Sequence, residues 1–203
     1  MDILITSVVA IIVALITSIF GPMLVEWFKL FLSKKKRDPI NEAIHHNSEV
    51  NHQLDLIIDE LGCNRIWIAM FHNGGHFYPT GKSIQKFSIF HEKIKDGTTS
   101  VMDIFQNIPI SLFPKTFSML NEDTEVYLSQ KENFDLDVFS RNWDTKSMYM
   151  FKLEDMEGRF IGTLALEYNE ETPLFKDNFI FIRQKLGVIG GIVTNYLKST
   201  QQK

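Results

Sequence analysis

The chain has 203 residues, of which 44% are hydrophobic and 23% charged, and its formal net charge is −4. This composition excludes collagenous, low-complexity and wholly disordered proteins, and the acidic balance gives no reason to expect a nucleic-acid partner. The single Cys63 cannot close an intrachain disulfide, so a secreted disulfide scaffold is excluded and a reducing compartment is the simplest interpretation.

The first segment of the chain predicts a membrane span. Residues 3–25 contain no charged side chain and are rich in Ile, Leu, Val and Ala. A helix of that length spans about 35 Å, enough to cross a hydrocarbon core of about 30 Å with some tilt. A buried core helix rarely stays uncharged over such a length, and a cleaved signal peptide needs a basic start that Met1-Asp2 does not supply. We therefore expect one N-terminal transmembrane helix.

A block of cations, Lys34, Lys35, Lys36 and Arg37, follows the uncharged segment. By the positive-inside rule this block places everything after it in the cytoplasm and the N-terminus outside. Anionic lipid head groups attract such a block, so the lipid bilayer of the plasma (inner) membrane is an expected partner. A nucleic-acid interpretation of the same block is disfavoured by the adjoining span. The expected organisation is an anchor with its basic segment in residues 1–37 and a cytoplasmic domain in residues 38–203.

Two long helices are predicted in that domain. Asp38-Pro39 is a helix start signal, and Gly62 marks an end. Between them a heptad seam holds Ile40, Ile44, Asn47, Asn51, Leu54, Ile58 and Leu61. Asn at such a seam favours pairing with a second copy, whereas packing on the helix's own domain is the alternative. A second seam after Pro173 holds Phe179, Ile182, Leu186, Ile189, Val193 and Tyr196, and Gly187 and Gly191 beside it permit close helix approach. We expect a homodimer.

The strands follow from alternating apolar residues. Residues 65–72 are apolar on both faces, which indicates a central strand, and Asn73-Gly74-Gly75 is a strong turn signal before a second strand at residues 87–91. Between Asp96 and Glu122 the apolar spacing is helical, with Pro109 and Pro114 as interruptions. The other expected strands cover residues 124–128, 146–153 and 160–168, the last two joined as an antiparallel hairpin by residues 154–159.

This order of elements is similar to that of the GAF sensory domain over residues 38–200. The resemblance is most specific in Ser147-Met148-Tyr149-Met150-Phe151-Lys152-Leu153, in Gly158-Arg159-Phe160-Ile161-Gly162-Thr163-Leu164-Ala165-Leu166, and in Phe175 with the closing helix. It implies an α+β fold, in which an antiparallel sheet carries the two terminal helices on one face and a ligand cavity on the other. Members of the family bind a small molecule, or dimerise, and relay that state to an effector.

The sequence also departs from the family pattern in ways that leave the cofactor unknown. The Asn-Lys…Phe-x-x-x-Asp-Glu signature of cyclic-nucleotide-binding members is absent, since the nearest string, residues 151–156, lacks the final acid. Cys63 precedes the first strand and does not match a bilin attachment position. Neither cyclic GMP nor a bilin is therefore expected.

The first hairpin is the best candidate for a ligand site. Residues 71–81 concentrate imidazoles, an amide, a phenol and glycines, which let the backbone approach a ligand closely. A plain turn whose Asn-Gly only reverses the chain is the alternative. Neither a metal-ligand spacing nor a nucleophile or phosphate-binding motif occurs, so we expect no metal and no enzyme activity. The candidate ligand-binding residues are His72, Asn73, Gly74, Gly75, His76, Tyr78, Gln85, Ser88, His91 and Glu92.

The leading hypothesis is a membrane-anchored cytoplasmic GAF-like sensory or regulatory module. It would bind a small polar ligand and relay through dimerisation or a separate partner protein. The alternative is a ligand-free interaction protein that recruits or regulates a partner at the membrane. A cavity lined by the glycine-rich hairpin would favour the first, and a cavity filled by Phe and Met would favour the second.

Overall fold

The computed structural model describes residues 7, 14, 17–18, 20–27, 39–76, 83–129 and 144–201. The chain divides into two compact units, residues 1–42 and residues 43–203. In the first unit, residues 20–27 are helical. No helix within the described ranges is both long enough and apolar enough to cross a membrane. Most of the expected span, and the cations Lys34, Lys35, Lys36 and Arg37, lie outside these ranges.

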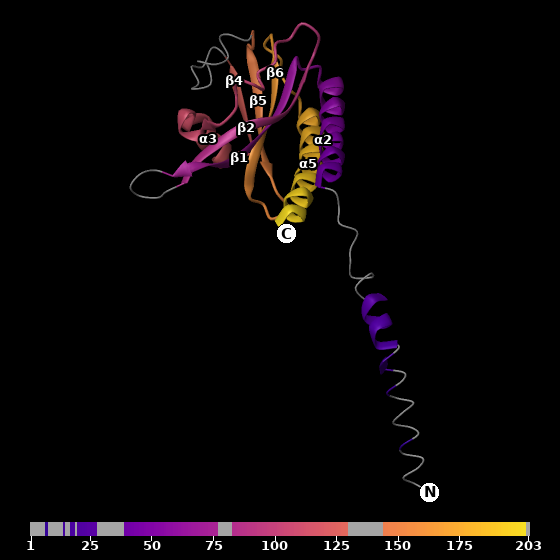
Figure 1. The fold of residues 1–203 in the computed structure, drawn as a ribbon. Helices are drawn as coiled ribbons and strands as arrows, with labels where there is room; N and C mark the ends of the chain where they lie inside the picture. Colours follow the sequence, from indigo (N-terminus) through magenta and orange to yellow (C-terminus); the bar gives the residue numbers. More distant parts are fainter. Residues whose placement is uncertain are drawn as a thin grey trace. The chain divides into compact units, whose positions relative to one another are not determined.

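Six strands form one antiparallel sheet in the order β3-β2-β1-β6-β5-β4 (Figure 1). β1 pairs with β2 on one side and with β6 on the other, which confirms the predicted central strand. The hairpin of β5 and β6 is also as predicted. The strands are β1 (Arg65–His76), β2 (Ser83–Ile94), β3 (Ile108–Pro109), β4 (Glu125–Ser129), β5 (Ser147–Glu154) and β6 (Phe160–Tyr168).

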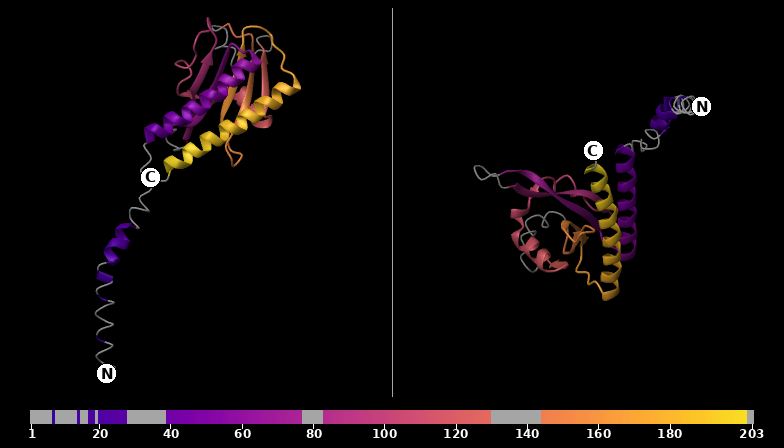
Figure 2. Two further views of the ribbon diagram at one scale, coloured as in Figure 1. Left: turned by 90° about the vertical axis from the view of Figure 1, so that its right-hand side faces the viewer. Right: turned by 90° about the horizontal axis from the view of Figure 1, so that it is seen from below.

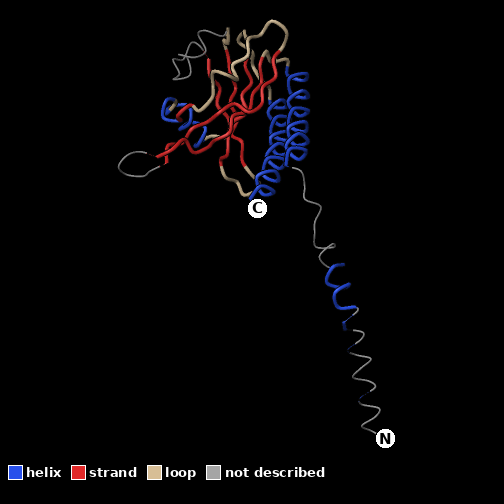
Figure 3. Tube along the Cα trace, in the orientation of Figure 1, coloured by secondary structure: helices blue, strands red, loops and turns tan. Residues whose placement is uncertain are grey.

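Two helices, α2 (Pro39–Leu61) and α5 (Lys176–Gln201), lie side by side on one face of the sheet (Figures 2 and 3). α2 begins at Pro39, as predicted, and Gly62 ends it in the left-handed conformation with φ of 66°. Its second half packs into the core through Leu54 and Ile57, while Ile40 and Ile44 at its beginning are 68% and 60% exposed. The predicted seam is therefore divided between the domain core and an exposed face.

The opposite face carries a separate core, built from side chains of the sheet and of the segment between β2 and β4. The helical spacing over residues 96–122 predicted helix there, but only α3 (Pro114–Glu122) is an α-helix. Before it come β3 and a short 3-10 turn, η1 (Ile110–Leu112). Asn107 has φ of 58°, which reverses the chain, and Pro109 is extended, so an α-helix cannot run through this segment.

Candidate functional site

The part of the β1–β2 hairpin nearest its tip holds two polar pairs, His72 with Ser88 and Asn73 with Gln85. His72 Nε2 lies 2.9 Å from Ser88 Oγ, which also accepts a hydrogen bond of 2.9 Å from the backbone N–H of Asn107. One step nearer the tip, Gln85 Nε2 donates to Asn73 Oδ1 at 3.1 Å. Because successive residues of a strand point to opposite faces, the two polar pairs lie on opposite faces of the sheet, and the second pair is exposed.

Three further candidates, Gly74, Gly75 and His76, are the last residues of β1. The pairing of the two strands is irregular between Asn73 and His76, and His76 then pairs with Ser83 at the start of β2. Another candidate, Tyr78, lies outside the described residues.

His91 and Glu92 lie at the other end of the hairpin and on opposite faces of the sheet. His91 Nδ1 is 3.3 Å from Asn51 Oδ1 of α2, and burial lowers the pKa of His91 below its usual range. Glu92 points to the other face, where it accepts a 2.8 Å hydrogen bond from the backbone N–H of Val101. The structure therefore does not bring these two residues to the hairpin tip.

Glu92 belongs instead to a buried charged cluster that sequence reasoning missed. We call it the Arg65 cluster. Its centre is the ion pair of Arg65 and Glu167, whose side chains are 1% and 2% exposed. Glu167 also accepts hydrogen bonds of 2.5 Å from Trp67 Nε1 and from Thr145 Oγ1. The cluster consists of Arg65, Trp67, Glu92, Thr145 and Glu167.

The Arg65 cluster fastens loops to one end of the sheet. Arg65 Nη2 donates to the carbonyl oxygen of Thr99 at 2.7 Å, and Glu92 holds the following turn through Ser100 and Val101. A polar cavity of about 80 Å³ lies beside it. Because the polar side chains of the cluster already have hydrogen-bond or ion-pair partners, we interpret this cluster as structural. The only sequence signal for it is a charged residue, Glu167, inside an otherwise apolar strand.

The face opposite α2 and α5 is filled by aromatic rings. Phe87, Phe105 and Phe113 are at most 3% exposed, and their ring centroids lie 5.8 to 6.5 Å apart. The cavity among them and Trp67 has a volume of about 10 Å³, which is about the space of one water molecule. This cavity therefore has no room for a larger ligand.

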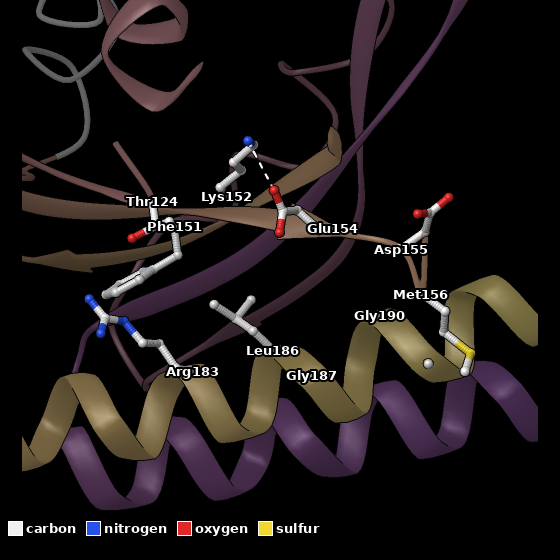
Figure 4. A pocket seen from close by; sticks show the side chains of 11 residues that line it. Thr124, Phe151, Lys152, Glu154, Asp155, Met156, Arg183, Leu186, Gly187 and Gly190 are labelled. Atoms are coloured by element: carbon white, nitrogen blue, oxygen red, sulfur yellow. Dashed lines mark ion pairs between the residues drawn. The ribbon is translucent and has the colours of Figure 1, made fainter. Parts of the chain in front are cut away.

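An open groove of about 540 Å³ lies between α5 and the end of β5 (Figure 4). Arg183 stands at one end, where it binds Glu125 of β4 with Nη2–Oε distances of 2.7 and 2.8 Å. Met156, 70% exposed, lies at the other end (Figure 4). Lys152 points away from α5 toward Glu154, at 2.9 Å, so the groove wall is mainly apolar and its charges are paired.

No metal centre emerges from these groups. Within the described residues, no three His, Cys, Asp or Glu side chains are placed to hold a metal ion. His72 and His91 in particular have separate partners, Ser88 and Asn51.

No protein-family model matches this sequence, and no curated protein sequence matches it. Solved structures do match its fold. The blue-light-absorbing form of the PixJ GAF domain of Thermosynechococcus elongatus has a TM-score of 0.59 at 10% identity, covering 79% of this chain and 91% of that one. The domain has the GAF fold.

Two further GAF domains show the same likeness. The GAF domain of a two-component sensor histidine kinase from Bacillus halodurans has a TM-score of 0.53 at 16% identity, covering 74% of this chain and 97% of that one. The phycoerythrobilin-bound GAF domain of a cyanobacterial phytochrome has a TM-score of 0.56 at 12% identity, covering 80% and 98%.

The residues described in this GAF fold do not suit a covalently held bilin. The single cysteine, Cys63, is fully buried in the core beneath α2 and α5, not on the aromatic face. Burial raises the pKa of its thiol to about 12, so the nucleophilic thiolate is scarce at neutral pH. The cavity among the phenylalanine rings of the aromatic face is too small for a tetrapyrrole.

Proposed function

We propose that this chain is a membrane-anchored cytoplasmic regulatory module with the GAF fold, which relays its state through α2 and α5. The helix pair is the observation that best supports this proposal. α2 follows the uncharged segment and the basic block in sequence, and it packs with α5 on one face of the sheet. Both helices still expose apolar side chains, with Ile44 60%, Ile180 45% and Val188 48% exposed. Such a face favours pairing with a second copy or a partner protein.

The anchor gives the first prediction. A cysteine placed after Lys203, in a chain whose Cys63 is replaced by alanine, will resist an impermeant thiol reagent in intact cells and react after lysis, because the basic block keeps the domain inside. A tag placed before Asp2 will be reachable from outside. Labelling of the C-terminal cysteine in sealed cells would refute this topology, and recovery of the chain in the soluble fraction would refute the anchor.

The sensory form of the proposal places a small polar ligand at the hairpin. The pair His72–Ser88 and the pair Asn73–Gln85 lie there on opposite faces, and His76 and Tyr78, close by in the sequence, are further hydrogen-bonding residues. Hydrogen-bonding side chains of this kind fix the orientation of a small molecule.

Native mass spectrometry of the detergent-extracted chain tests this form. We expect a dimer mass with an added small molecule that is lost in His76→Ala and Tyr78→Phe, while the melting temperature stays unchanged. Tyr196→Phe, a phenol change on α5, serves as the matched control and should retain the added mass.

A ligand-free interaction protein is the second candidate function. The observation that favours it is the aromatic face, where Phe side chains leave a cavity of only about 10 Å³. On this reading the native mass spectrum shows the protein mass alone, in the wild type and in both hairpin variants. The same measurement therefore decides between the two candidates.

A further inference from the structure

The segment that joins β6 to α5 is held to the sheet in an unusual way. We call residues 169–175 the connector. Its polar contacts to the sheet come from hydroxyl groups on two neighbouring strands, not from backbone pairing. The contributing side chains are Tyr127 and Ser129 of β4 and Ser147 and Tyr149 of β5.

Two of these hydroxyls hold the connector backbone. Ser147 Oγ donates to the carbonyl oxygen of Glu170 at 2.7 Å and accepts from the N–H of Thr172 at 3.3 Å. Tyr149 Oη donates to the carbonyl oxygen of Thr172 at 2.9 Å and accepts from the N–H of Leu174 at 3.1 Å. Each hydroxyl thus makes one hydrogen bond to a backbone carbonyl and one to a backbone N–H of the connector, which a neighbouring strand would otherwise make.

The other two hydroxyls bind one carboxylate of the connector. Tyr127 donates to Glu171 Oε2, and Ser129 donates to Glu171 Oε1 at 2.8 Å. Burial and the adjacent Glu171 raise the pKa of Tyr127 to about 12, so its phenol keeps the proton that it donates throughout the physiological range. The Tyr127 ring also packs against the Tyr149 ring, with the two ring centroids 4.7 Å apart. The carboxylate contact is therefore coupled to the backbone contacts.

The apolar face of α5 is buried along the helix, through Phe179 against Tyr149 and through the fully buried Ile182 and Ile189. Thr194 accepts a hydrogen bond of 3.2 Å from the N–H of Met156. The connector before the helix is in contrast largely exposed, and the ion pair of Arg183 with Glu125 is more than half exposed on the arginine side. Segments with few buried apolar contacts and solvent-exposed hydrogen bonds open at a lower free energy than the core.

We propose that the connector is a releasable strap on α5, and that the contact of Tyr127 and Ser129 with Glu171 is its latch. When the latch opens, the connector no longer fixes the distance between β6 and α5, and α5 is held by its apolar face, the exposed Arg183–Glu125 ion pair and Thr194. α5 can then shift along the sheet. This deepens the proposed function, because α5 is the helix through which that function relays a signal.

Hydrogen exchange of the full-length chain in detergent tests the strap. Tyr127→Phe keeps the ring and removes the latch hydroxyl, and Ser147→Ala removes two backbone contacts. Since one hydrogen bond contributes modestly to stability, we expect amides of residues 170–178 to exchange about five-fold faster in each variant. Strands β1 and β6 should exchange as in the wild type.

Tyr168→Phe is the matched control, because its hydroxyl donates to Leu61 of α2 at 3.4 Å and does not touch the connector. It should leave exchange of the connector unchanged. Unchanged exchange in Tyr127→Phe and Ser147→Ala, or an equal increase over the whole domain, would overturn the strap. This exchange experiment does not depend on the anchor or on a ligand. The strap can therefore be refuted while the proposed function stands, and the proposed function can be refuted while the strap stands.

Discussion

Replacing Arg65 with leucine is expected to lower the free energy of unfolding by about 3–5 kcal/mol, because it leaves a buried carboxylate without its cation. Glu167 is 2% exposed and bonds Arg65 Nη1, so the change leaves its buried carboxylate without a paired cation. The change also removes the donor that holds the carbonyl oxygen of Thr99. Chemical denaturation followed by circular dichroism measures the loss.

Two control variants distinguish the cost of leaving a buried charge unpaired from the cost of substituting any ion-paired residue. The double variant Arg65→Leu, Glu167→Leu should regain much of the loss, since apolar residues often replace a buried ion pair at little cost. Lys93→Leu breaks a partly exposed pair with Asp55 (2.9 Å) and should cost less than about 1 kcal/mol. A loss in Arg65→Leu no larger than that of Lys93→Leu would contradict the burial of the cluster.

The strands and the ends of the helices were predictable because they depend on local sequence. Alternating apolar residues place β1, β5 and β6, and Pro39 and Gly62 bound α2, whose start and end need no distant contact. The segment between β2 and β4 was not predictable in this way. Its apolar spacing is helical, but its residues meet the sheet through turns.

The Arg65 cluster shows the limit of local reasoning. Arg65, Glu92 and Glu167 lie on three different strands, and only the pairing of those strands brings them together. The hairpin illustrates the same limit. Each of its strands is 12 residues long. His91 on β2 therefore lies far from the tip, although it belongs to the same hairpin as His72 on β1.

Within the chain, the close approach of α5 is made by a glycine other than Gly187 and Gly191, which were expected to permit a close helix approach. A Cβ on either would meet nothing within 4 Å, whereas a Cβ on Gly190 would lie 2.4 Å from the carbonyl oxygen of Glu154. Gly190 is therefore the residue that lets α5 approach β5. A signal for this was present, since Gly190 is four residues from both Leu186 and Thr194, on the buried side of the helix.

Ile189→Asp and Ile180→Asp, nine residues apart on α5, should have opposite effects on folding and pairing. Ile189 is fully buried in the core beneath the helices, so an aspartate there is expected to cost at least about 4 kcal/mol and to leave little folded protein. Ile180 is 45% exposed, so the same change should shift the unfolding free energy by less than about 1 kcal/mol.

If α5 pairs with a second copy, Ile180→Asp will instead convert dimer to monomer in light scattering of the detergent-extracted chain, while circular dichroism stays that of the wild type. The charge would be buried only in the dimer, so its cost falls on association alone. A folded Ile180→Asp variant that remains fully dimeric would exclude the exposed face of α5 from the interface. In that case α2, whose Ile40 and Ile44 are also exposed, becomes the helix to test.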